Sequence, residues 1–131
     1  MRRLEPYARS LLHIVVGALF TCHGLQKLAG MFGGLGAGGA AAHLGSLMWF
    51  AGVLETVGGL LITLGLYTRP AAFVLCGEMA VAYFHVHAPR GLWPIRNGGE
   101  LAVLYCFIYL YLAAAGAGPI SLDRLVRRVK T

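Results

Sequence analysis

The chain has 131 residues, of which 58% are hydrophobic and only 12% are charged, and its formal net charge is +6. A soluble domain of this length would not stay in solution at a mean hydropathy of +0.71, so the composition excludes an ordinary soluble enzyme. We predict an integral membrane protein whose main partner is the lipid bilayer.

Four apolar stretches approach the roughly 20 residues that cross about 30 Å of hydrocarbon. They are residues 11–28, 47–66, 70–87 and 99–115. Backbone polar groups cannot face lipid unpaired, and the stretches are far longer than the ~10-residue alternating strands of a membrane barrel. The predicted fold class is therefore all-α. We expect an integral membrane four-helix bundle that forms a single transmembrane domain over residues 1–131.

The first stretch follows Arg2, Arg3 and Arg9, which imitate the basic start of a signal peptide. No convincing small-residue cleavage motif follows it, so we predict a retained first span. The next loop, residues 29–45, contains the glycine run GGLGAGG and is predicted to be a mobile, non-cytoplasmic loop. It lacks the fixed spacing of a dinucleotide-binding fingerprint.

Residues 66–70 are predicted to form a tight turn, with Pro70 in the first turn of the third helix. The second external loop, residues 88–97, is suited to the headgroup level. After the fourth span, residues 120–131 are predicted to form a short amphipathic tail, capped by Ser121, that lies on the inner leaflet.

The basic residues predict the orientation in the membrane. In a four-span model, Lys27, Arg90 and Arg96 fall on one side. The other eight fall on the opposite side: Arg2, Arg3, Arg9, Arg69, Arg124, Arg127, Arg128 and Lys130. Both termini are therefore predicted to be cytoplasmic. Topology and anionic lipid headgroups account for the net charge, so no nucleic-acid partner is needed.

Ionisable residues within the apolar stretches are the main functional signal. An acid at a helix centre costs roughly 2.5 to 3.5 kcal/mol and normally marks a functional site. Glu55 is the strongest candidate, and the proposed catalytic set is Glu55, Lys27, Glu100 and Glu78. The proposed ligand-binding set is His23, Gln26 and His85. At 1.5 Å rise per residue, these side chains converge on the outer half of the bundle.

Each of these residues also has a plainer interpretation. Lys27 can snorkel to the interface instead of pairing with Glu55 or Glu100, and Glu78 can form a structural link between helices. Glu100 can be an acid that stabilises the start of a helix through the helix dipole, and His85 can be an interfacial residue. The three cysteines lie in three different spans and are expected to be packing residues. No spacing specific for a metal is present, so no metal site is predicted.

Five segments in combination carry a resemblance to a known family. The segments are HGLQK at 23–27, GVLETVGGL at 52–60, GLYTRPA at 65–71, NGGE at 97–100 and GAGPISLD at 116–123. With them the chain resembles the DoxX family of small bacterial membrane proteins, from about residue 9 to residue 123. The resemblance implies a four-helix bundle in the bacterial cytoplasmic (inner) membrane. It also implies that Lys27, Glu55 and Glu100 occupy the polar intramembrane positions that recur in the family.

Members of that family are linked to membrane oxidoreductase systems, including a quinone-reducing one. The resemblance therefore implies a membrane subunit of a quinone-linked oxidoreductase, with a quinone or small reductant in the outer pocket and proton relay through the acids. The chain has no cofactor-binding domain and no closely spaced cysteine pair, so a partner subunit, or a homo-oligomer, would complete such a system. Two alternatives stay open, a non-enzymatic scaffold that docks a partner protein and a small-solute or proton-coupled transporter.

Overall fold

The computed structural model describes residues 3–129. The regular elements in that part of the chain are all helices, and the only extended pairing is an isolated bridge between Leu35 and Ala40. The predicted all-α fold class is thus confirmed. Arg2 and Lys130, which entered the orientation prediction, lie outside the described residues, as does the end of the predicted tail.

Four long helices account for most of the chain. They are α1 (Glu5–Ala29), α2 (Leu47–Leu64), α3 (Thr68–Ala82) and α5 (Glu100–Ala115). Three helical stretches are long and apolar enough to cross a membrane: Glu5–Ala29, Leu47–Leu64 and Thr68–Arg90. Helix α5 is apolar but has only 16 residues, a length of about 24 Å, so this fourth predicted span is short for the bilayer.

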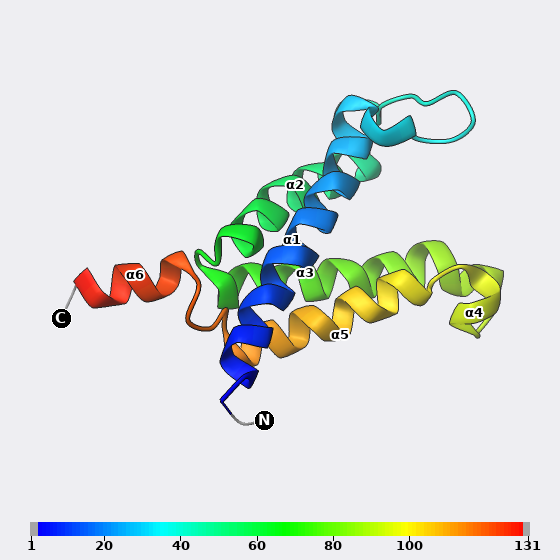
Figure 1. The fold of residues 1–131 in the computed structure, drawn as a ribbon. Helices are drawn as coiled ribbons and strands as arrows, with labels where there is room; N and C mark the ends of the chain where they lie inside the picture. Colours follow the sequence, from blue (N-terminus) through cyan, green and yellow to red (C-terminus); the bar gives the residue numbers. More distant parts are fainter. Residues whose placement is uncertain (1–2, 130–131) are drawn as a thin grey trace.

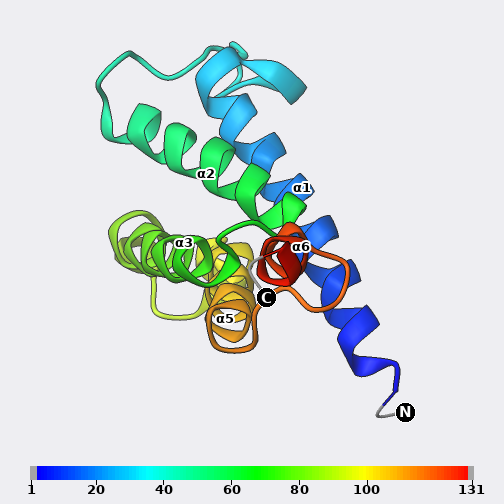
Figure 2. The ribbon, with the colours of Figure 1, turned by 90° about the vertical axis from the view of Figure 1, so that its left-hand side faces the viewer.

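The helices form two pairs rather than one parallel bundle. Helix α1 packs along α2, and α3 packs along α5. Figure 1 shows the two pairs meeting near the N-terminus and diverging toward the other end, and Figure 2 shows the α3–α5 pair nearly end-on beside α1. The short helix α6 (Leu122–Val129) projects from the end where the pairs meet.

Glycines allow α1 and α2 to approach closely. A Cβ atom added to Gly17 would lie 2.4 Å from the backbone nitrogen of Thr63, and one added to Gly24 would lie 2.4 Å from that of Thr56. The facing glycines of α2 are Gly59, opposite Gly17, and Gly52, opposite Gly24. Small residues at helical spacing are the usual means of close packing between membrane helices.

Polar side chains lock the end where the two pairs meet. His13 is fully buried, with Nδ1 2.7 Å from the carbonyl oxygen of Ile62 and Nε2 3.0 Å from that of Ile120. The Ser10 hydroxyl donates to the carbonyl of Ala117 at 3.1 Å and accepts from the amide of Ile120. These bonds hold the segment that follows α5 against the start of α1.

The opposite end of α3 departs from a regular helix. The π-helix η2 (Tyr83–His87) continues α3, followed by the 3-10 turn η3 (Ala88–Arg90) and the short helix α4 (Pro94–Asn97). A further 3-10 turn, η1 (Met31–Gly33), opens the glycine-rich loop. The buried side chain of Asn97 fixes the turn into α5, because its Nδ2 donates to the carbonyl of Gly91 at 2.8 Å and its Oδ1 accepts from the amide of Gly99.

Candidate functional site

The ammonium of Lys27, near the end of α1, forms an ion pair and a hydrogen bond with Oε2 of Glu55 in the middle of α2. The Lys27 side chain is 16% exposed and that of Glu55 is 5% exposed. Gly52, one turn before Glu55, leaves room for Lys27, since a Cβ there would lie 3.0 Å from the Cβ of Lys27. Gly52 therefore lets the Lys27 ammonium reach the Glu55 carboxylate. Lys27 pairs with Glu55 rather than with Glu100.

Glu78 brings a second carboxyl to this pair from α3. It interacts electrostatically with both Glu55 and Lys27. Both of its carboxyl oxygens are buried, and neither has a hydrogen-bond partner among the described residues. We call Lys27, Glu55 and Glu78 the buried charge cluster. Because a buried polar group without a partner costs about 1 to 3 kcal/mol, this unsatisfied carboxyl requires an explanation.

Aromatic side chains lie beside the buried charge cluster. Phe20 of α1 contacts Tyr105 and Tyr109 of α5, with ring centroids 5.0 Å apart in each case. His23 meets Tyr105 edge-on at 6.0 Å. The hydroxyl of Tyr109 is buried without a hydrogen-bond partner in the described residues, and it interacts electrostatically with Glu78 and Glu55. We call Phe20, His23, Tyr105 and Tyr109 the aromatic wall.

The remaining predicted site residues lie apart from this cluster. Glu100 is exposed in the first turn of α5, the position of an acid that favours a helix start. Gln26 is half-buried and makes no hydrogen bond within residues 3–129. His85 is exposed on η2. Since a π-helix has a wider turn than an α-helix, η2 changes the direction of His85 relative to Glu78 from that in a continuous α-helix.

Sequence reasoning missed Tyr105 and Tyr109. Their spacing of four residues placed them on one face of the fourth span, and a buried tyrosine normally finds a partner for its hydroxyl. It also missed that two of the cysteines meet. The thiols of Cys76 in α3 and Cys106 in α5 lie 3.7 Å apart, and no sequence signal relates residues on two different helices.

Two cavities were found away from the buried charge cluster. One, of about 220 Å³, lies at the end where the helix pairs meet. The other is a shallow hollow at the end of α3, lined by Ala80, Val81, Phe84 and His85. Neither is lined by a member of the cluster. Within the described residues, no group of three or more histidine, cysteine or acidic side chains is arranged to hold a metal ion.

Comparison with known proteins gives one family. The model of the DoxX family matches residues 8–88. A Haemophilus influenzae protein named only as uncharacterized is 45% identical over 130 residues, covering 94% of this chain and 93% of the relative. A Bacillus subtilis protein named "Putative oxidoreductase CatD" is 27% identical over 120 residues, covering 92% and 87% of the two chains. No solved structure matches.

Proposed function

The chain belongs to the DoxX family and is a multi-pass membrane protein, and from this premise we propose that it is a membrane subunit of a quinone-linked oxidoreductase. The name of the Bacillus subtilis relative supports an oxidoreductase role. We further propose that it resides in the bacterial inner membrane with both termini in the cytoplasm, as the distribution of basic residues favours. A partner subunit, or a second copy of the chain, would supply what this small bundle lacks.

The observation that supports this proposal is the unsatisfied carboxyl of Glu78 beside the Lys27–Glu55 ion pair. Intramembrane ionisable residues are expensive and commonly lie on proton or substrate pathways. The helices α1, α2 and α3 each contribute one member of the buried charge cluster. A structural link between helices would need only the ion pair.

The hydrogen-bonding groups of the buried charge cluster and the aromatic wall match those that a quinone needs. When bound, a quinone supplies a two-electron acceptor whose two carbonyl oxygens accept hydrogen bonds and take up two protons on reduction. The Lys27 ammonium can donate a hydrogen bond to such an oxygen, and the Tyr109 hydroxyl is a second donor with no protein acceptor in the described residues. The aromatic wall surrounds these donors with apolar rings, the kind of surroundings that suit a planar ring.

The acids then move protons. Glu78 can hold a proton on an oxygen that no protein group engages, and Glu55 lies within its electrostatic range. Glu55 remains tied to Lys27, which orients it. In this proposal Glu78 exchanges the proton, while the ion pair beside it supplies the charged surroundings that affect its protonation.

The experiment that tests this proposal is binding of a short-chain quinone to the purified protein in detergent, measured by equilibrium dialysis. Glu78→Gln keeps the shape of the side chain but removes the acidic proton that Glu78 would donate to a quinone oxygen, and we expect it to weaken binding by about tenfold or more, the worth of one lost buried hydrogen bond to a charged or acidic group. Glu100→Gln is the matched control, because Glu100 is exposed on the neighbouring helix. Equal binding by the wild type and Glu78→Gln would contradict the proposal.

A further inference from the structure

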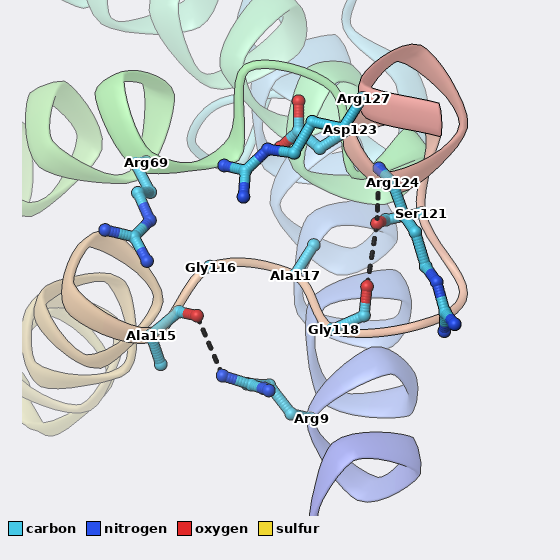
Figure 3. A pocket seen from close by; sticks show the side chains of 10 residues that line it. All are labelled: Arg9, Arg69, Ala115, Gly116, Ala117, Gly118, Ser121, Asp123, Arg124 and Arg127. Carbon is cyan, nitrogen blue, oxygen red and sulfur yellow. Dashed lines mark hydrogen bonds between the residues drawn. The ribbon is translucent and has the colours of Figure 1, made fainter. Parts of the chain in front are cut away.

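The cavity of about 220 Å³ is lined by none of the residues of the buried charge cluster. It is lined by Arg9 of α1, Arg69 of α3, Arg124 and Arg127 of α6, Asp123, and the segment 116–118 that leaves α5. Four arginines from three helices thus surround one hollow. Figure 3 shows Arg9 and Arg69 on either side of Gly116, with Arg127 approaching from α6.

The one acid that lines this cavity is already used. The two carboxylate oxygens of Asp123 accept from the backbone amides of Tyr67 and Thr68, at 2.8 and 3.0 Å. These amides start α3, so the carboxylate acts as a helix cap and its charge is offset by the helix dipole. Glu5, outside the cavity wall, lies 3.5 Å from Nε of Arg9. With four arginines and one aspartate in its lining, the cavity carries a positive formal charge.

Arg9 is held in place by the segment that leaves α5. The Arg9 side chain is 20% exposed, and its Nη1 donates to the carbonyl of Ala115 at 2.7 Å. Its Nε is buried and makes no hydrogen bond in the described part of the chain. Arg69 lies beside Gly116, where a Cβ would be in ordinary van der Waals contact with Nε of Arg69 at 3.5 Å, and the φ of 77° at this position favours glycine.

From this arrangement we propose that the cavity is a binding site for a phosphate group. Guanidinium groups present planar donor pairs that match phosphate oxygens, and several on separate helices can grip one phosphate from different sides. The exposed apolar residues Leu125, Val126 and Val129 of α6 suit a helix lying on a membrane surface, which would put the cavity at headgroup depth. The phosphate then belongs to a phospholipid headgroup or to a soluble phosphate ester.

The test uses the purified full chain in detergent and two probes. Retention of dioleoyl phosphatidic acid, against dioleoyl phosphatidylcholine, is measured by native mass spectrometry, and binding of inorganic phosphate is measured by calorimetry. Arg69→Gln removes an exposed guanidinium with little effect on packing, and Arg124→Gln is a second variant of the same kind. Arg96→Gln, an exposed arginine of α4 that does not line the cavity, is the matched control.

We expect the wild type and Arg96→Gln to bind a phosphate probe alike, and Arg69→Gln to bind it about tenfold more weakly. If the loss is seen with phosphatidic acid, the source is a lipid headgroup. If it is seen with inorganic phosphate while lipid retention is unchanged, the source is a soluble phosphate ester. Binding of both probes that is the same in all variants, or no binding to the wild type, would overturn the proposal.

Discussion

Lys27→Met is expected to destabilise the protein by about 3 to 5 kcal/mol, because it leaves the carboxylate of Glu55 buried without its counter-charge. Glu55→Gln is expected to destabilise it too, by leaving the Lys27 ammonium without its anion. The double variant should cost less than either single one, since removing both members of a buried pair leaves no isolated charge. The measurement is reversible unfolding in mixed detergent micelles, combined as a double-mutant cycle.

The same cycle separates a structural role from a functional one. A scaffold that needs the pair only to hold its helices together would still bind its partner protein in the refolded double variant. A quinone site that uses the charges would lose quinone binding in that variant. The control is Glu100→Gln, which removes an exposed acid and should change stability by less than about 0.5 kcal/mol. Additive costs in the cycle would show that the two side chains are not coupled, contrary to the structure.

Gly24→Ala is expected to cost about 3 kcal/mol, at the upper end of the range for overpacking. The added Cβ would lie 2.4 Å from the backbone nitrogen of Thr56 and 2.8 Å from the backbone oxygen of Gly52, and backbone cannot move aside as a flexible side chain can. Helices α1 and α2 must separate, which also pulls Lys27 from Glu55. Thermal unfolding in detergent measures the loss.

The matched control for this change is Gly77→Ala on α3. Nothing lies within 4 Å of a Cβ at Gly77, so the substitution should be neutral or stabilise the helix by up to about 1 kcal/mol. Because both variants make the same chemical change within a long helix, the difference between them isolates the close contact of α1 with α2. Equal effects at the two positions would contradict the packing described above.

The sequence predicted the helices well because hydropathy and length decide where an apolar segment lies. It also predicted that Lys27 and Glu55 could meet, since depth follows from position along each helix. The depth of a residue in the membrane does not tell how its helix is rotated about its own axis. That rotation is set by packing against neighbouring helices. For that reason the sequence predicts that Glu100 and His85 converge with Glu55, whereas both are exposed in the structure. The contact of Cys76 with Cys106 escaped prediction for the same reason.

Two further features depend on tertiary structure. The π-helix at Tyr83–His87 has no sequence signal of its own, and it alters the register of the end of the third span. The cavity walled by arginines is assembled from α1, α3 and α6, whereas the sequence indicated only that these arginines share one side of the membrane. The positive-inside rule places charges on a side of the bilayer and does not bring them to one point.

The most direct test of the proposed function is native purification in mild detergent, followed by mass spectrometry of every lipid-soluble small molecule and protein that remains bound. The account predicts a quinone that accompanies the wild type and is lost from folded Glu55→Gln, because the Lys27–Glu55 ion pair beside Glu78 is then broken. A wild type that carries no quinone but retains a partner protein in fixed proportion would contradict the quinone site and favour a docking scaffold.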